Sequence, residues 1–224
     1  MRWTVLENET EVAYAACDRI VSIAKQAIES SGQFHIVLAG GTTPAATYAL
    51  LAKQHCQWEC WHVWFGDERC LPVGHEDRNS TMVHDLFTGK VPIPADQVHV
   101  IPAELGPDAA AKQYACITAD QPPFDLVILG MGEDGHTASL FPGTDYAKDI
   151  LVLPVFNAPK HPAQRVSMSA ELISRSRHLL FLITGASKHD AVTRWQQGEP
   201  LPVALVNGIE TTEVLIDSNA LGHK

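Results

Sequence analysis

Apolar and polar residues along this chain follow two spacings, one typical of helices and the other of buried strands. Between residues 10 and 29, apolar side chains recur at every third or fourth position, as Val12, Ala16, Ile20, Ile23 and Ala27. This spacing places them on one face of a helix. We expect Thr10 to cap that helix and Gly32 to end it.

Short apolar runs elsewhere in the chain predict strands. They lie at residues 34–39, 61–65, 124–129, 151–156, 165–168, 178–184, 203–206 and 213–216. Helical patterns lie between several of them, at residues 45–53, 79–87, 108–117 and 187–197. Because strands alternate with helices and several strands are apolar throughout, we predict an α/β fold whose mostly parallel sheet is covered on both faces. With no internal repeat or linker in 224 residues, we expect one domain over residues 1–224.

The composition of the chain limits which binding partners and which cellular compartment we expect for the protein. The net charge of −10 disfavours a general surface for nucleic acid or for anionic membranes. The first residues lack the apolar core of a signal peptide, and no stretch approaches the ~20 apolar residues of a membrane helix. The cysteines are odd in number and lack the spacing of a zinc site, at Cys17, Cys56, Cys60, Cys70 and Cys116. We therefore expect a cytoplasmic protein with neither a disulfide framework nor a bound metal.

The segment LGMGEDGHTASLFPG, residues 129–143, contains the pattern G-x-G-x-x-G directly after an apolar run. This is the spelling of a turn that binds the pyrophosphate of a dinucleotide. However, Glu133 and Asp134 lie inside the pattern, where their charges would repel a pyrophosphate. The next predicted strand also ends without the carboxylate that binds the ribose of such a cofactor. A dinucleotide site is therefore disfavoured.

The same segment places His136 on a glycine-flexible turn at the end of a strand. An imidazole titrates near pH ~6.5, so at neutral pH it can take a proton from water as a general base. We predict this role for His136, with Asp134 or Asp67 fixing its tautomer and orientation. A histidine that only caps the turn is the alternative.

A glycine-threonine turn, LAGGTTP, follows the predicted strand at 34–39. Gly40 and Gly41 let backbone N–H groups approach a ligand, and Thr42 and Thr43 add hydroxyl donors at a helix N-terminus. The turn fits a single phosphate, although an ordinary strand–helix turn with a threonine cap explains it equally well.

Charged residues end or begin other strands near the same expected edge of the sheet. Asp67 and Arg69 in WFGDERCLP can orient hydroxyls and bind an anion, or form a surface salt-bridge loop. Arg165 and Lys188 can each supply positive charge to a phosphate, or be solvated surface residues. The proline-rich stretch 157–165 is expected to be a surface loop.

These segments, in this order, resemble the 6-phosphogluconolactonase family. The matching stretches are LAGGTTPAATYALLA, HVWFGDERCLP with NST after it, VPIPADQVHVIP, PFDLVILGMGEDGHTASLFPG, QRVSMSAELISRSRHLLFLITGASK and EVLIDSNA. The resemblance spans nearly the whole chain. It implies a three-layer α/β sandwich, a modified Rossmann-like fold related to sugar-phosphate isomerases and aminosugar-phosphate deaminases. It also implies hydrolysis of 6-phospho-D-glucono-1,5-lactone with no metal or organic cofactor, and we expect a monomer or a weak homodimer.

The resemblance implies a role for each candidate residue. His136 matches the proposed general base, and Asp67 matches an acidic residue that faces the sugar. The GGTTP turn with Arg69, Arg165 and Lys188 matches positions that hold the phosphate or the sugar acid.

Two alternatives remain on the same scaffold. In aminosugar-phosphate deaminases and isomerases, the DGH turn continues to a glutamate, whereas this chain has Leu140 and Phe141 in that region. A non-catalytic sugar-phosphate sensor would keep the cations without needing His136.

Overall fold

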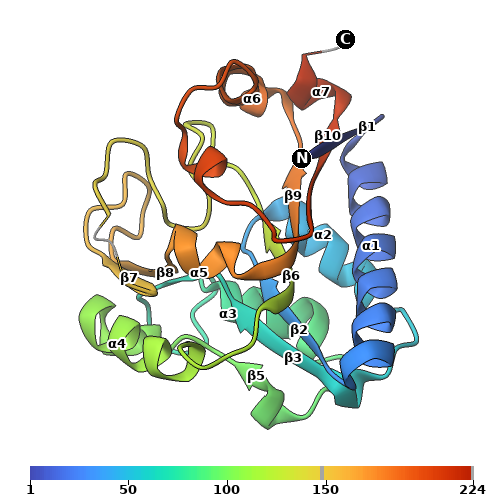
Figure 1. The fold of residues 1–224 in the computed structure, drawn as a ribbon. Coiled ribbons are helices and arrows are strands. Elements are labelled where there is room, and N and C mark those ends of the chain that lie inside the picture. The colour runs from blue at the N-terminus through green and yellow to red at the C-terminus, as the bar shows by residue number, and fades with distance from the viewer. Residues whose placement is uncertain (147–148, 223–224) are drawn as a thin grey trace.

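A sheet of seven parallel strands forms the centre of the computed structural model, which describes residues 1–146 and 149–222 (Figure 1). The strand order is β1-β10-β9-β6-β2-β3-β5, and each neighbouring pair is parallel. The strands are β1 (Arg2–Leu6), β2 (Phe34–Leu38), β3 (Trp61–Phe65), β5 (Val98–His99), β6 (Phe124–Leu129), β9 (Ser176–Ile183) and β10 (Thr211–Asp217). All residues of β2 and β6 are buried, as their mostly apolar sequences predict, and the buried His35 and Asp125 are the exceptions to that composition.

Helices cover both faces of this sheet. They are α1 (Glu9–Ser31), α2 (Thr42–Leu51), α3 (Asn79–Val83), α4 (Pro107–Thr118), α5 (Ala170–Ser174), α6 (His189–Gln196) and α7 (Ser218–Leu221). Trp61 and Trp64 lie three residues apart on β3, so they point to opposite faces. Trp61 lines a groove with residues of α1, whereas the Trp64 ring lies 6.3 Å from the ring of Tyr114 on α4. Figure 1 shows α1 and α4 on the two sides, which confirms the predicted three-layer architecture.

A second, smaller sheet stands beside the first. It contains β4 (Asp67–Arg69), β8 (Arg165–Met168) and β7 (Val152–Val155), paired antiparallel in that order. The sequence predicts the β7 and β8 segments as strands but does not separate them from the parallel sheet. The chain leaves β3 through Gly66, whose carbonyl accepts from the Met168 N–H at 2.7 Å, so β4 pairs with β8. This pairing places Arg69 opposite Arg165.

Several predicted elements need correction. The segment 203–206 is not a strand, because Pro202–Leu205 forms a 3₁₀ helix in which the Val203 N–H donates to the Gly135 carbonyl. Helix α1 starts two residues earlier than a cap at Thr10 predicts, and Asn8 rather than Thr10 caps it by accepting from the Glu11 N–H. The predicted helix 79–87 is α3 followed by a π-helical turn at His84–Thr88.

The predicted Gly32 stop is confirmed, since Gly32 ends α1 with φ of 81°. Strands β1, β4 and β5 lack a predicted counterpart, and β4 and β5 have only three and two residues. No described helix is long and apolar enough to cross a membrane.

A nearly buried carboxylate joins the edge of the sheet to α1. Glu213 on β10 accepts hydrogen bonds from Thr4 on β1 at 2.9 Å and from Arg19 on α1 at 3.1 Å. It also pairs with Arg2 at 2.6 Å. Burial alone would raise the pKa of Glu213, but these hydrogen bonds outweigh it and hold that pKa below its ordinary value.

Replacing Glu213 with Gln should therefore destabilise the fold in a pH-dependent way. At pH 7 we expect a loss of about 1.5–3 kcal/mol, the contribution of a hydrogen bond to a charged group. Because the folded-state pKa is depressed, the difference from wild type should be full above the unfolded pKa and shrink as the pH falls through the folded value. Urea unfolding at pH 7 and pH 3 measures this. An equal difference at both pH values would contradict it.

Candidate active site

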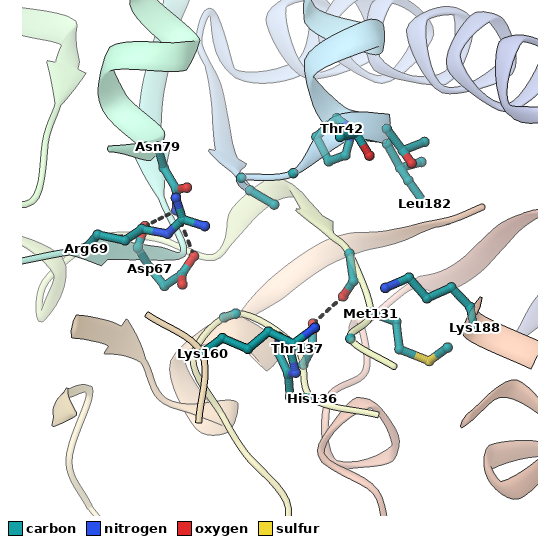
Figure 2. Close-up of a pocket in the computed structure, with 18 of the residues that line it drawn as sticks. Thr42, Asp67, Arg69, Asn79, Met131, His136, Thr137, Lys160, Leu182 and Lys188 are labelled. Atoms are coloured by element: carbon teal, nitrogen blue, oxygen red, sulfur yellow. Dashed lines mark hydrogen bonds between the residues drawn. The ribbon is translucent and has the colours of Figure 1, made fainter. Parts of the chain in front are cut away.

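The carboxyl ends of β2, β6 and β9 open into one cavity of about 300 Å³. Four segments that the sequence predicts at this edge line it, after β2, after β3, after β6 and after β9. All the predicted site residues except Asp134 line the cavity, namely Gly40, Gly41, Thr42, Thr43, Asp67, Arg69, His136, Arg165 and Lys188. Figure 2 shows Arg69, Asp67 and Asn79 at one end of the cavity and Lys188 at the other.

The glycines after β6 make room for the imidazole of His136. A β-carbon on Gly132 would lie 2.0 Å from His136 Nδ1, a distance that no side chain could occupy. Gly135 has φ of 85°, which disfavours other residues, and a β-carbon there would meet Leu201 at 2.7 Å. A β-carbon on Gly130 would meet nothing within 4 Å. Within the pattern G-x-G-x-x-G, Gly132 thus makes room for the ring of His136 and Gly135 for the packing of the turn against Leu201, so a pyrophosphate is not needed to explain these two glycines.

Asp134 lies behind the ring and orients it. Its Oδ1 is 2.5 Å from His136 Nδ1 and also accepts from the His136 N–H at 3.2 Å. Partial burial raises the pKa of Asp134, but the hydrogen bonds and charge of His136 outweigh it and lower that pKa below its ordinary value. A proton on Nδ1 directed at a carboxylate leaves Nε2 with a free lone pair, as a general base requires.

Asp67 has other partners. Its Oδ1 accepts from Asn79 Nδ2 at 3.0 Å and its Oδ2 accepts from Ser139 Oγ at 2.6 Å. Asn79 itself fits because residue 40 is glycine: a β-carbon there would lie 2.0 Å from Asn79 Oδ1. Of the two acids that the sequence left open, Asp134 therefore makes the contact with His136, and Asp67 ties the second sheet to the turn after β6.

A fully buried carboxylate, Glu68, holds the start of α3 against β4. It accepts from the N–H groups of Asn79 at 2.7 Å and Ser80 at 2.8 Å, which an isolated helix start leaves without partners. Glu68 also lies 3.6 Å from Arg78 Nε, another buried charge. No side chain caps the start of α3 from the N-cap position, Arg78. Glu68 thus places Asn79 at the cavity wall.

Two arginines face each other where β4 pairs with β8. Arg69 Nη1 donates to the Asp77 carbonyl at 2.5 Å, and its buried Nε has no hydrogen-bond partner among the described residues. Burial lowers the pKa of Arg165, and the charge of Arg69 lowers it further, while Asp67 partly offsets both. Adjacent like charges beside an open cavity favour an anionic ligand.

Lys188 brings a third positive charge, at the start of α6. Burial lowers its pKa, and the nearby charge of Lys160 lowers it further against the opposing charges of Glu133 and Asp134. Next to it, Thr43 Oγ1 lies 2.6 Å from Thr184 Oγ1, which joins the turn after β2 to the end of β9.

Several cavity residues lack a sequence-based prediction: Asn79, Met131, Thr137, Ala138, Lys160, His161, Leu182 and Thr184. The stretch 157–165 is expected to be a surface loop, yet Lys160 and His161 from it reach the cavity wall. A lysine and a histidine shortly before Arg165 could have indicated that this loop reaches the site. The proline-rich composition of the stretch made it look like an ordinary surface loop instead. Among the described residues, no group of three or more His, Cys, Asp or Glu side chains is arranged to hold a metal ion.

Comparison with known proteins shows which family this chain belongs to. The profile of the family described as glucosamine-6-phosphate isomerases/6-phosphogluconolactonase matches residues 7–215, so the chain belongs to that family. The 6-phosphogluconolactonase of Mycobacterium leprae is 34% identical over 96% of this chain and 95% of its own length. That of Synechocystis is 37% identical over 84% of this chain and 82% of its own. The crystal structure of 6-phosphogluconolactonase from Thermotoga maritima superposes with a TM-score of 0.90 at 30% identity, over 96% of this chain and 99% of that one.

Replacing Gly132 with Ala should move the imidazole of His136. The added methyl group occupies the place of Nδ1, so the contact with Asp134 must break, at a stability cost of about 1–3 kcal/mol. NMR should show altered chemical shifts of the His136 ring. Gly66→Ala is the matched control, since its β-carbon would meet Val37 Cγ1 at an ordinary 3.6 Å. Wild-type chemical shifts of the ring in Gly132→Ala would show that the ring does not depend on this glycine.

Proposed function

We propose that this protein hydrolyses 6-phospho-D-glucono-1,5-lactone to 6-phosphogluconate, the second step of the oxidative pentose phosphate pathway. One observation carries the proposal. The imidazole of His136, oriented by Asp134, opens onto the same cavity as the glycine-threonine turn and Lys188. A base, a phosphate-binding turn and a cation within one small cavity are the groups that a phosphorylated ester substrate needs.

The phosphate end of the proposed site lies at Thr42, Thr43 and Lys188. The turn presents backbone N–H groups and hydroxyls at the start of α2, where the helix dipole favours negative charge. Lys188 adds a positive charge, and the buried charge of Arg165 raises the potential of the whole cavity. Anchoring here fixes the lactone ring over His136, so part of the barrier is removed by positioning.

The reacting end lies at His136 and Arg69. His136 Nε2 takes a proton from a water molecule as the water oxygen attacks C1 of the lactone. Arg69, which lines the cavity, supplies the positive charge that stabilises the tetrahedral oxyanion. The imidazolium then returns the proton to the ring oxygen as the C1–O bond breaks, and Asp134 stabilises the imidazolium in between. The lactone is an activated ester, so a general base that contributes about 10²–10⁴-fold goes far toward the needed rate.

The substrate of this proposal is a small phosphorylated sugar lactone, and neither nucleic acid nor a membrane is a partner. We place the reaction in the cytoplasm, with the protein as a monomer or a weak homodimer.

The deaminase or isomerase alternative is disfavoured by the residues beside the histidine. Opening an aminosugar ring would use a carboxylate there, but the neighbouring ring is Phe141, centred 4.8 Å from the His136 ring, and Leu140 is buried. A sugar-phosphate sensor would need the cations but would gain nothing from the Asp134–His136 pair. Ammonia release from glucosamine 6-phosphate, or tight phosphosugar binding without turnover, would favour these alternatives.

Substituting His136 by Asn should remove the base and keep the shape of the cavity. We expect kcat to fall about 10²–10⁴-fold, the usual contribution of a general base, with little change in KM. The assay follows acid release from freshly made lactone and subtracts spontaneous hydrolysis. His84→Asn is the control, because His84 is exposed and away from the cavity lining. Turnover of the wild type at the background rate would refute the proposed activity, and retained kcat in His136→Asn would refute the role of the residue.

A further inference from the structure

The guanidinium of Arg165 is directed at the protein backbone. Its Nε donates to the Pro162 carbonyl at 3.0 Å, and its Nη2 donates to the carbonyls of Lys160 at 2.8 Å and His161 at 3.4 Å. The residue is only 5% exposed. Three successive backbone carbonyls of one loop thus accept hydrogen bonds from a single buried side chain. The planar guanidinium of arginine, with several N–H donors, suits these carbonyls better than the ammonium group of lysine does.

The loop that Arg165 holds carries two side chains to the cavity wall. A hydrogen bond from the Ala158 N–H to the Ala163 carbonyl, at 3.0 Å, closes its base. Lys160 and His161, between these ends, both line the cavity. With the carbonyls of residues 160–162 turned toward Arg165, the placement of these two side chains depends on the guanidinium.

Lys160 lies in the electrostatic environment of the proposed phosphate end. Its Nζ is 3.5 Å from Glu133 Oε2, and both residues act on the pKa of Lys188. Glu133 and Asp134 oppose Lys160 in their effect on Lys188, so Lys160 supplies a second ammonium group where two carboxylates would otherwise outweigh the charge of Lys188. Lys160 and Glu133 are both about half exposed, so their ion pair is weak and Lys160 can exchange it for a ligand.

We propose that Arg165 is a positioning residue, whose guanidinium holds the 160–162 segment so that Lys160 and His161 contact the oxygens of the phosphosugar. The inference rests on the proposed function in one respect, that this cavity takes a phosphorylated sugar. It assigns Lys160 and His161 as substrate contacts and makes the effect of Arg165 on binding an indirect one.

A charge-conserving variant separates this from direct binding by Arg165. Arg165→Lys keeps a positive charge but cannot span three carbonyls, so it should raise the Kd for 6-phosphogluconate about tenfold, close to the effect of Arg165→Ala, about 1.4 kcal/mol. Calorimetric titration measures the Kd. In the lactone assay, KM should rise while kcat changes by less than about threefold, as expected when ground-state binding is lost. Arg165→Lys with wild-type affinity would overturn the proposal, because charge would then suffice.

A double-mutant cycle tests the route through the loop. In a Lys160→Met/His161→Asn background, Arg165→Lys should change the Kd by less than about twofold, because the groups it positions are already gone. The same tenfold factor in both backgrounds would show that Arg165 acts on the ligand independently. Circular dichroism checks the fold of each variant. If the Arg165 variants do not fold, Lys160→Met and His161→Asn still decide, since an unchanged Kd in both would remove the loop from the site.

The outcome for the proposed function is read separately. A wild type that binds 6-phosphogluconate and shows this coupling, but does not hydrolyse the lactone, would refute the lactonase activity and leave the role of Arg165 standing. A wild type that binds neither 6-phosphogluconate nor inorganic phosphate would overturn both.

Discussion

The imidazole of His136 occupies the volume that a β-carbon on Gly132 would fill. The orientation of the ring toward the cavity depends on this close contact. The backbone closes around the ring, because the Gly132 N–H donates to the His136 carbonyl at 2.8 Å and the Gly135 N–H donates to the Gly132 carbonyl at 3.0 Å. Asp134 comes from the same short turn and meets Nδ1. A turn of a few residues therefore sets both the orientation of the ring and its tautomer.

The charged groups that complete the site come from parts of the chain that are distant from His136 in the sequence. Parallel strands deliver the glycine-threonine turn and Lys188 to one edge, as an open α/β sheet does for most ligands. The small antiparallel sheet adds Arg69 and Arg165 from the side. Buried polar contacts of Glu68 and Asp67 with Asn79 connect the small sheet to the start of α3 at the cavity wall. In a protein with net charge −10, these cations are gathered around one cavity.

Much of this arrangement could be predicted from local sequence. Strands β3 and β6 match the predicted limits because each is an apolar run bounded by turn residues, and His136 could be singled out by its glycine-rich surroundings. Strand β4 could not be predicted, because its sequence DER has no apolar pattern and the segment forms a strand only by pairing with β8. The place of Asn79 could not be predicted either, because it depends on Gly40, which is distant in the sequence. The place of Lys160 depends on Arg165, and both belong to a proline-rich segment without a regular pattern. Local periodicity carries no information about such contacts.

The central claim is that one cavity holds the phosphate at the turn after β2 and the reacting carbon at His136. A crystal structure with 6-phosphogluconate bound tests it most directly. The account predicts the phosphoryl group at Thr42, Thr43 and Lys188, with the C1 carboxylate within hydrogen-bond reach of His136 Nε2. A reversed ligand, with its carboxylate at the glycine-threonine turn and its phosphoryl group beside His136, would contradict it.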